Sequence, residues 1–410
     1  MAKKTNLIVG LDIGTTKICC IIGEITRTDG VDIIGLGQHP STGLRKGVVV
    51  NIDSTVSSIK SAVEEAELMA GCEIESAFVG IAGGHIKSMN SHGIIAVKNK
   101  EVNEQDVSRV IEAAKAIAIP MDREVLHVLP QEFIIDNQDG IKTPLGMAGV
   151  RLEAKVHIVT AAVTSAQNIV KCVNKAGIDV QDIVLEQLAS SESVLSSDEK
   201  ELGVALVDIG GGTSDLALFY QGAIKHTSVL AIAGAQITND IAIGLRTPNN
   251  EAEKIKHMYG CALPVLVRPN DAIEIVNVGG RAPKEVSRQI LSEIIEARCK
   301  EMFEIMNNEI EMSGYHDLIS SGIVLTGGVA AMEGLAEQAE RVFQVPVRIG
   351  SPKGLGGLID VVSNPRYATS AGLIIYGMKN LKTGHKHELK GRNLFEKILT
   401  RMKDWVEEFF

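Results

Sequence analysis

Short apolar runs separated by glycine-containing turns dominate the start of the chain, which is the pattern of strands in a buried sheet. Between the third and fourth runs, apolar residues recur at helical spacing and predict a helix over Ser54–Met69. The expected strands are Leu7–Ile13, Lys17–Ile25, Val31–Leu36 and Ser76–Ala82. Strands that alternate with helices in this way indicate an α/β fold.

The same pattern returns in the second half of the chain. Val204–Ile209 and Asp215–Tyr220 are expected as strands joined by a glycine turn, and Ala223–Leu230 follows as a third strand. Asp12-Ile13-Gly14 and Asp208-Ile209-Gly210 therefore occupy equivalent positions, 208 − 12 = 196 residues apart. A strand–Asp–Gly–strand unit that recurs after about half the chain predicts two related lobes facing one another.

Two segments do not follow the lobe pattern. Gly84 to about Thr160 is expected to form an inserted subdomain, in which Asn103 caps a helix. Its expected short strands are Val125–Val128, Phe133–Ile135 and Leu152–Val159. Asn249 to about Asn308 is expected to be a second insertion that includes a long helix, Lys284–Asn307. A chain of 410 residues is too long for a single core, which agrees with two subdivided lobes.

Both glycine turns carry residue types that suit phosphate. Glycine lets the backbone approach an anion, and a turn directs N–H groups toward it. An aspartate at the strand end can hold Mg²⁺ through water, and a lysine adds positive charge. One such turn alone is often only a hairpin, but a matched pair predicts a clamp on the β- and γ-phosphates of ATP. The expected residues are Asp12, Gly14, Thr15, Thr16, Lys17, Asp208, Gly210, Gly211, Gly212 and Thr213, with Asp12 and Asp208 as the magnesium-shell carboxylates.

A third turn completes the expected nucleotide site. In Ile323–Met332 an apolar strand runs into a Gly-Gly turn and then a helix, so that bare backbone meets a ligand at a helix N-terminus. Gly234 opens a further helix and is expected to line the same cleft. Glu253 and Lys256 share one helix face, where they either bond the ribose or form an exposed ion pair; the residues alone favour the exposed pair. The expected adenosine-loop residues are Gly327, Gly328, Val329 and Met332.

The segment Asn393–Phe410 has an apolar stripe at helical spacing, and its opposite face is charged. A basic linker, Lys379–Arg392, precedes it. Each positive charge close to an anionic lipid surface contributes about 1 kcal/mol to binding. The helix either packs on its own core, fills a partner's groove or lies on a membrane surface, and we favour the membrane. The expected membrane-facing residues are Leu394, Phe395, Ile398, Leu399, Met402, Trp405, Val406, Phe409 and Phe410.

Composition excludes several classes of protein. A net charge of −10 argues against general nucleic-acid binding, because phosphate backbones repel an acidic chain. The six cysteines show neither a CxxC motif nor zinc spacing, so we expect reduced thiols. There is no signal-peptide pattern and no apolar run near the length of a membrane span. We therefore expect a cytoplasmic protein that lies on a membrane instead of crossing it.

The three loops, in this order, resemble those of actin, the heat-shock chaperone ATPases and sugar kinases. Leu188–Leu195 and Ala368–Tyr376 resemble the helices that connect the lobes in those proteins. Among these proteins the chain is most similar to the FtsA family of actin-like bacterial cell-division proteins, over essentially its whole length. The segments that carry this resemblance are VGLDIGTTKI, LPQEF, IKTPLGMAGVRLEAKVH, LGVALVDIGGGTSDLALF, AEKIKHMYGCA and VLTGGVAAMEGL. The resemblance implies an α/β, actin-like two-lobed fold with duplicated strand–helix lobes, an inserted subdomain and a C-terminal amphipathic helix.

The resemblance also implies a function. It implies an ATP- and Mg²⁺-binding protein that polymerises, anchors FtsZ filaments to the inner face of the cytoplasmic membrane at the septum, and helps recruit other division proteins. The FtsZ tail is expected at about Leu230–Asn308, where Arg288 and Arg298 either meet its acidic residues or are simply solvated. Glu186 is the candidate for orienting water, with slow hydrolysis at most. The alternatives are an actin-like protein of pilus assembly or cell shape and a sugar kinase, for which no base is identifiable.

These features predict a division of the chain into eight segments. They are the first lobe with the phosphate-1 loop (1–83), the inserted subdomain (84–162), the first-lobe return with the first connecting helix (163–202), the second lobe with the phosphate-2 loop (203–229), the second-lobe tip (230–308), the adenosine loop with the second connecting helix (309–378), the basic linker (379–392) and the membrane-targeting helix (393–410).

Overall fold

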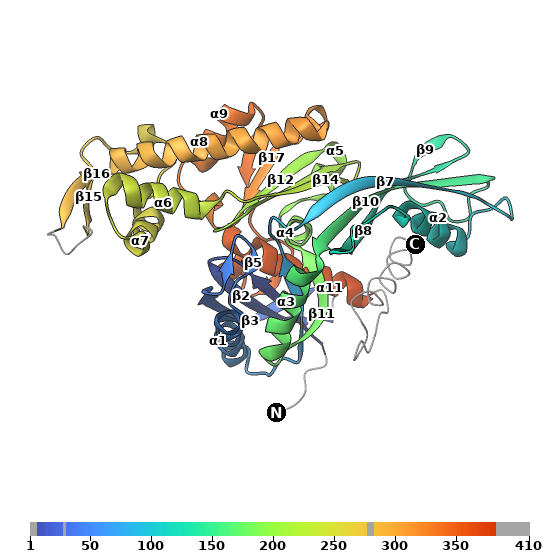
Figure 1. The fold of residues 1–410 in the computed structure, drawn as a ribbon, viewed down its shortest axis with the longest axis horizontal. Helices are drawn as coiled ribbons and strands as arrows, with labels where there is room; N and C mark the ends of the chain where they lie inside the picture. The colour runs from blue at the N-terminus through green and yellow to red at the C-terminus, as the bar shows by residue number, and fades with distance from the viewer. Residues whose placement is uncertain (1–5, 28–29, 277–282, 383–410) are drawn as a thin grey trace.

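The computed structural model describes residues 6–27, 30–276 and 283–382, which form two α/β lobes and a β-rich subdomain beside them (Figure 1). The sheet of the first lobe has the strand order β11 (Asp179–Leu185), β6 (Ser76–Ile81), β1 (Leu7–Ile13), β2 (Lys17–Ile25), β3 (Val31–Pro40), β19 (Gly356–Gly357). The sheet of the second lobe has the order β14 (Ala223–Leu230), β13 (Ser214–Tyr220), β12 (Val204–Ile209), β17 (Ile323–Thr326), β18 (Val347–Ile349).

The two sheets share one topology. In each, the first three strands of the lobe are antiparallel neighbours, and the first strand also pairs in parallel with a later strand. The registers match as well, because Asp12 lies opposite Cys19 and Asp208 lies opposite Asp215. The duplication predicted from the sequence is therefore confirmed, and Asp215 is the second-lobe counterpart of Cys19.

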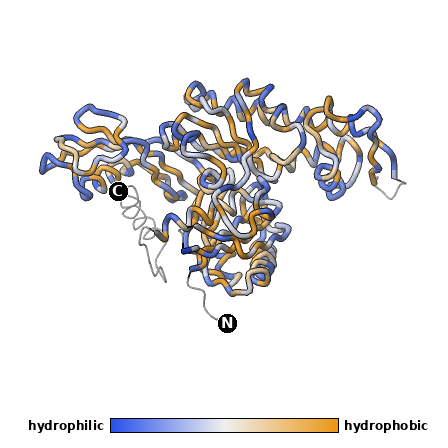
Figure 2. The backbone as a smooth tube through the Cα atoms, turned by 180° about the vertical axis from the view of Figure 1, so that it is seen from behind, coloured by the Kyte–Doolittle hydropathy of each residue, from blue (hydrophilic) through white to orange (hydrophobic). Residues whose placement is uncertain are grey.

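Helices cover both faces of the first-lobe sheet. Helices α1 (Ile52–Ala70) and α3 (Val163–Lys175) pack on one face, and α4 (Glu186–Val194) with α11 (Ala368–Lys382) packs on the other. The Asn51 side chain caps α1 by accepting a hydrogen bond from the Ser54 N–H at 3.0 Å. Figure 2 shows apolar segments running through the interior of the lobes.

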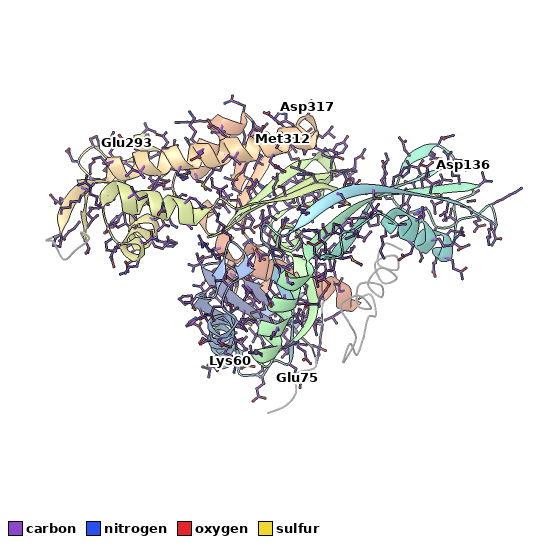
Figure 3. All side chains as sticks on the ribbon, in the orientation of Figure 1. Lys60, Glu75, Asp136, Glu293, Met312 and Asp317 are labelled. Atoms are coloured by element: carbon purple, nitrogen blue, oxygen red, sulfur yellow. The ribbon has the colours of Figure 1, made fainter. Side chains whose placement is uncertain are left out.

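In the second lobe, the main helices gather on one face of the sheet. They are α6 (Gly234–Leu245), α7 (Asn249–Tyr259), α8 (Arg288–Ser313) and α9 (Leu335–Phe343). Charged side chains lie on the outer surfaces, as Lys60 and Glu75 do on the first lobe and Glu293 does on α8 (Figure 3). The remaining short elements are β4 (Leu44–Arg45), β5 (Val48–Val49), α5 (Ser197–Leu202), α10 (Ile359–Val362), η1 (Pro264–Leu266), η2 (His316–Leu318), η3 (Val329–Ala331) and η4 (Pro365–Tyr367). All six cysteines are free.

The inserted subdomain is a separate sheet with a core of its own. Its strand order is β7 (Lys87–Ala96), β10 (Arg151–Ala162), β8 (Arg123–Ile135), β9 (Gln138–Ile141), and α2 (Glu104–Lys115) covers one face. Asn103 caps α2 as expected, since its side chain accepts from the Asp106 N–H at 3.1 Å. The expectation of two short strands between 125 and 135 is wrong: β8 continues through Pro130, because a bulge in its pairing with β10 accommodates the proline.

The tip of the second lobe differs from its expected form. Residues expected to begin a long helix at Lys284 form strand β16 (Lys284–Ser287), which pairs with β15 (Ala272–Ile275). Helix α8 begins only at Arg288, after Ser287 caps it, and it ends at Ser313 because Gly314 adopts a left-handed conformation with φ of 76°. The expected boundary at residue 308 therefore falls inside a helix.

Helices α4 and α11, which contain the two segments that resemble connecting helices, cross in close contact. The Ser193 hydroxyl donates to the Ala368 carbonyl at 2.7 Å, and a Cβ on Gly372 would lie only 1.8 Å from the Ala189 carbonyl oxygen. The expected linker start at Lys379 is wrong, because α11 continues to Lys382 and Lys379 pairs with Glu192 on α4. The rest of the linker, 383–392, and the amphipathic segment 393–410 lie outside the described residues.

Candidate functional site

Two glycine hairpins of the same shape end strands β1 and β12. In the first, the Gly14 N–H donates to the Lys17 carbonyl at 3.0 Å; in the second, the Gly210 N–H donates to the Thr213 carbonyl at 3.0 Å. Each hairpin follows an aspartate at the end of its strand. The sequence repeat thus produces two matching loops, one from each lobe.

The two loops lie face to face. A Cβ on Gly211 would lie 2.4 Å from the Thr16 hydroxyl oxygen, and a Cβ on Gly212 would lie 2.5 Å from the Thr15 hydroxyl oxygen. Real Cβ atoms do not approach other atoms so closely, so this arrangement requires glycine on the second-lobe loop. The Thr15 hydroxyl also accepts a hydrogen bond from the Gly47 N–H at 2.9 Å, which ties the first loop to its own lobe.

Asp12 and Asp208 stand at the base of the loops, and each is only 7% exposed. Two hydroxyls of α11 bond to them: Thr369 donates to Asp208 at 3.1 Å, and Ser370 lies 3.5 Å from Asp12. Helix α11 therefore reaches both strand-end carboxylates. Its two hydroxyl residues gave no recognisable signal in the sequence.

Four carboxyl groups lie close together here, and burial disfavours the charged form of each. Burial raises the pKa of Asp208 to about 6, and the neighbouring Asp12 charge adds to the shift. Burial also raises the pKa of Asp12, although Lys17 opposes the shift from 3.7 Å away. The pKa values of Glu186 and Asp215 lie well above the usual range, because burial and the neighbouring aspartates disfavour their charged forms.

Such a group of carboxylates fits a hydrated cation better than a directly ligated one. Within the described ranges, no group of three or more His, Cys, Asp or Glu side chains is arranged to hold a metal ion directly. The Asp215 Oδ1 atom, however, is buried without a hydrogen-bond partner. Mg²⁺ keeps several waters when it binds phosphate, so Asp12 and Asp208 suit the expected role of holding it through water. Asp215, which ends the phosphate-2 motif, was missed as a site residue.

Lys17 lies beside the first loop, where it is expected to contact phosphate. It also contacts groups outside that loop. Its ammonium donates to the Arg366 carbonyl at 2.6 Å and lies 5.0 Å from the centroid of the Tyr367 ring. These contacts, with the 3.7 Å approach to Asp12, hold the lysine between the first loop and the start of α11.

The adenosine side is built from β17 and the start of α6. Gly327 follows β17 with φ of +88°, and a Cβ there would lie 2.4 Å from an Asp208 carboxylate oxygen. No other atom lies within 4 Å of where a Cβ on Gly328 would stand, so this position is open. Gly234 begins α6 as expected and lies against Val329, with 2.9 Å between its added Cβ and that side chain.

The expected helix directly after the Gly-Gly turn is wrong. Residues Val329–Ala331 form a single 3-10 turn, and α9 begins only at Leu335. Gly334, with φ of 76° in the left-handed region, separates the two. Met332 thus lies on an extended link instead of a helix.

Lys256 is buried, which contradicts the alternative of an exposed ion pair. It is 8% exposed, and its ammonium donates to the Glu253 carboxylate at 2.8 Å, the Thr238 hydroxyl at 2.9 Å and the Gly234 carbonyl at 3.2 Å. Burial acts to raise the pKa of Glu253, but hydrogen bonds from His257 and Lys256 lower it to about 2. The pair therefore joins α7 to the start of α6.

Glu186, the candidate for orienting water, begins α4 above strand β6. A Cβ on Gly80 of that strand would lie 3.3 Å from the Glu186 side chain. The electrostatic influence of Asp12, Asp208 and Asp215 on its pKa places this carboxyl in the same buried group.

Arg288 and Arg298 are already engaged within their own lobe. Arg288 donates to Glu333 at 2.8 Å and to the Tyr259 carbonyl at 2.9 Å. Arg298 pairs with Asp240 and Glu301. Their expected contacts with a partner's acidic tail stay a prediction, and such contacts would have to replace or share these pairs.

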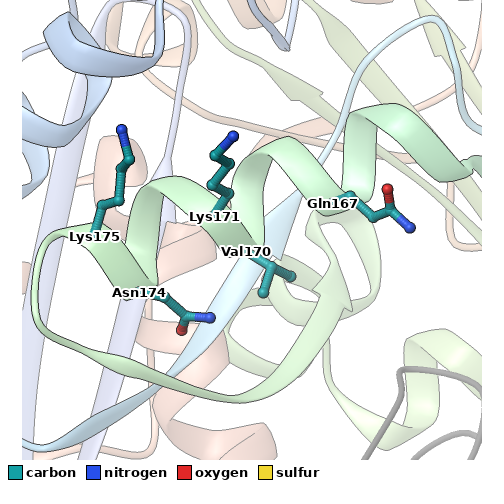
Figure 4. A pocket seen from close by; sticks show the side chains of 5 residues that line it. All are labelled: Gln167, Val170, Lys171, Asn174 and Lys175. Atoms are coloured by element: carbon teal, nitrogen blue, oxygen red, sulfur yellow. The ribbon is translucent and has the colours of Figure 1, made fainter.

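A surface hollow of about 460 Å³ lies on α3, away from the loops (Figure 4). It is lined by Gln167, Val170, Lys171, Asn174 and Lys175, which all belong to that helix. A hollow along a single helix lacks the convergent groups of a buried ligand site. The nucleotide loops remain the strongest candidate site.

Known proteins share the two-lobed fold. The structure resembles that of the type IV pilus protein in the "PilM-PilN type IV pilus biogenesis complex", with a TM-score of 0.65 and 16% identity over 92% of this chain and 99% of that chain. It also resembles MreB5 of Spiroplasma citri bound to ADP, with a TM-score of 0.56 and 15% identity over 93% of this chain and 99% of that chain. These similarities confirm the actin-like fold, and at this level of identity they show the fold alone.

Sequence similarity is much closer within one family. The family model described as "Cell division protein FtsA" matches residues 205–372, and the "SHS2 domain inserted in FTSA" matches residues 83–160. The cell division protein FtsA of Pseudomonas aeruginosa is 54% identical over 99% of this chain and 98% of its own length. The FtsA protein of Escherichia coli K12 is 42% identical over the full length of both chains. The chain therefore belongs to the FtsA family of cell division proteins.

Proposed function

We propose that the protein binds Mg²⁺ and ATP between its lobes, polymerises in the ATP-bound form, and anchors FtsZ filaments to the inner face of the cytoplasmic membrane at the septum. The observation that carries the nucleotide part is the contact of two matching glycine loops, one from each lobe, above two buried aspartates. Nucleotide polyphosphate between such loops would join both lobes at once.

Each part of the cleft has a proposed role. The N–H groups of the two loops bind the β- and γ-phosphates, while Asp12 and Asp208 hold Mg²⁺ through water. The Mg²⁺ ion supplies positive charge that offsets both the phosphates and the buried carboxylates. Gly234, Lys256 and Glu253 border the ribose and adenine, and the Gly327-Gly328 turn approaches the α-phosphate.

Hydrolysis is proposed to be slow. Glu186 is the residue best placed to orient a water, but burial and the neighbouring aspartates raise its pKa and so disfavour its charged form. The charged carboxylate is the form that accepts a proton from water. ATP would then act mainly by holding the lobes together, with polymerisation as the consequence.

Attachment to the membrane is assigned to the segment 393–410, whose apolar stripe and basic approach favour a membrane surface. Within the described ranges, no helix is both long and apolar enough to span a bilayer. One surface helix binds reversibly, whereas many helices on a polymer bind firmly together. Polymerisation would therefore control attachment. The FtsZ tail would bind at the second-lobe tip, and the attached polymer would help recruit other division proteins.

Trp405, the single tryptophan of the chain, reports on this attachment. With Mg²⁺, ATP and vesicles containing anionic lipid, we expect a blue shift of its fluorescence and co-sedimentation of the protein. Deletion of 393–410 should abolish co-sedimentation. Ile398→Glu should weaken binding by roughly tenfold to a hundredfold, because one large buried apolar side chain contributes about 1.5–3 kcal/mol.

Glu396→Asp, which keeps the charge on the opposite face of the predicted helix, is the matched control and should bind as the wild type does. An unchanged spectrum with all protein in the supernatant would overturn the membrane assignment. A second outcome, in which Ile398→Glu and Glu396→Asp bind alike, would mean that the apolar stripe does not drive attachment.

A further inference from the structure

The inserted subdomain belongs to the first lobe by chain connection but touches the second lobe. It leaves the first lobe after β6 and returns to it before α3. Its strands β7 and β8 nevertheless lie beside β14, the edge strand of the second-lobe sheet (Figure 1). The subdomain therefore spans the boundary between the lobes at a place separate from the phosphate loops.

Side chains of the inserted subdomain bond to the backbone carbonyls of β14. Ser88 donates to the Thr227 carbonyl at 2.8 Å, and Asn90 donates to the Lys225 carbonyl at 3.1 Å. Gln131 donates to the Ile224 carbonyl at 2.8 Å. Because these bonds use side chains and not a backbone ladder, one side can separate from the other without unfolding a sheet.

His157 lies at the centre of this contact and bonds to residues on both sides of it. Its ring is 1% exposed, and its two nitrogens lie 2.7 Å from the Asn90 side-chain oxygen and 2.9 Å from the Thr227 hydroxyl. Burial lowers the pKa of His157 to about 3, so the ring is neutral. A neutral ring donates from one nitrogen and accepts at the other, so it donates to Asn90 and accepts from Thr227.

The other end of the subdomain adjoins the first lobe, and there Arg123 joins the chain segment that leaves that lobe to the strand that returns to it. The Arg123 guanidinium donates to the His85 carbonyl at 2.9 Å and to the Thr160 carbonyl at 2.8 Å. His85 follows Gly83, whose backbone lies against Gly47, with 2.7 Å between a Cβ added to Gly47 and the Gly83 Cα. Gly47 in turn donates to Thr15 of the loop, so a chain of contacts leads from the base of the subdomain to the loop.

We propose that the contact of Ser88, Asn90, Gln131 and His157 with β14 is an interlobe clasp that is closed when the phosphate loops meet and open when they part. The two lobes touch both at the loops and at the clasp, so a rotation that separates one contact strains the other. This inference rests on the proposed nucleotide function, because ATP between the loops would favour the closed clasp. By linkage, the clasp also raises the affinity for ATP.

Hydrogen exchange of the segment 223–230 in the full chain tests the clasp. With Mg²⁺ and ATP, we expect exchange to be slower by roughly tenfold than without nucleotide. Asn90→Ala should remove most of this difference and weaken ATP binding by about fivefold or more. His92→Ala is the matched control: His92 lies on the same strand but pairs with Glu153 of its own subdomain, so both readouts should match the wild type.

A second arm does not depend on nucleotide binding. In Gly211→Ala the added Cβ keeps the phosphate loops apart, so segment 223–230 should exchange at the fast rate with or without ATP. Ser88→Ala, which removes a single bond, covers the case in which Asn90→Ala fails to fold. If the segment is equally protected in the wild type without nucleotide, with ATP and in Gly211→Ala, the subdomain is permanently fixed to the second lobe and the clasp is refuted. If ATP fails to bind but segment 223–230 still exchanges faster in Gly211→Ala than in the wild type, the proposed nucleotide function is refuted and the clasp is supported.

Discussion

Asp208→Asn is expected to stabilise the nucleotide-free protein by about 3 kcal/mol at pH 7.5 while weakening ATP binding in Mg²⁺ by roughly tenfold to a hundredfold. The stabilising part follows from the pKa of Asp208, which rises from its usual 3.8 to about 6 in the folded protein. Above the folded pKa, the native state must carry a buried charge that the unfolded chain carries in water. Asparagine removes that cost and still accepts a hydrogen bond from Thr369.

The sign of the pH dependence identifies the cause. A carboxyl whose folded pKa is raised lowers stability as pH rises from 3.8 to about 6, and the cost is constant above that range. The gain from Asp208→Asn should therefore shrink to about 1.5 kcal/mol at pH 5. Urea unfolding of both proteins at the two pH values measures it.

Asp179→Asn, an exposed change of the same charge at the start of β11, is the control and should change neither stability nor ATP binding. A loss of stability in Asp208→Asn at pH 7.5 would mean that the aspartate stabilises the apo fold, contrary to a site that awaits a cation. An undiminished ATP affinity in Mg²⁺ would remove Asp208 from the metal shell.

Gly211→Ala is expected to lower ATP affinity by more than roughly a hundredfold without unfolding either lobe. The added Cβ would lie 2.4 Å from the Thr16 hydroxyl oxygen and 2.9 Å from its Cβ, which no rotation of the side chain moves away. The loops must separate, and the β- and γ-phosphates then contact only one of them. Loss of the charge-assisted hydrogen bonds on one side of a charged ligand weakens its binding by about 3 kcal/mol or more.

A compensating change makes this test specific. Thr16→Gly removes the three atoms that lie nearest to the new Cβ, so the double variant should recover most of the affinity that the single variant loses. Gly84→Ala is the neutral control, because no atom lies within 4 Å of a Cβ at that position. Calorimetric titration with ATP measures the ATP affinity of the single variant, the double variant and the control. Failure of the double variant to recover would show that Gly211 matters for its own backbone and not for the contact between loops.

Much of the lobe architecture could be predicted because its signals are local. The expected strands Leu7–Ile13, Lys17–Ile25, Val204–Ile209 and Ala223–Leu230 match the structure at both ends. The first three are mostly apolar runs beside a glycine turn, a signature that fully buried strands keep. Ala223–Leu230 is polar in its middle and only partly buried, and its place after the second-lobe hairpin in the repeat is what identified it.

Strand β7 could not be predicted in the same way. It exposes one face and carries Ser88, Asn90 and His92, so it lacks the apolar signature of the buried strands. The start of α8 was missed for a related reason, since Lys284–Ser287 is as polar as a helix surface and becomes a strand only by pairing with β15.

The loops of the candidate site could be predicted, but the buried charge around them could not. Asp12 and Asp208 follow from the repeat, and Asp215 lies opposite Asp208 in the β12–β13 pairing, whereas the approach of Glu186 to the second-lobe aspartates depends on how the lobes close. Lys256 looked like an exposed partner of Glu253 because its burial comes from α6, which packs over it through Gly234 and Thr238. Spacing along one helix holds no information about a second helix.

Calorimetric titration of the wild-type protein with ATP, ADP and AMP in Mg²⁺ tests the two-loop clamp most directly. If both loops hold the β- and γ-phosphates, ATP and ADP should bind, and AMP should bind at least about a hundredfold more weakly, since it lacks the groups that make charge-assisted bonds to the loops. AMP that binds as tightly as ATP, or the absence of binding by all three nucleotides, would contradict the clamp.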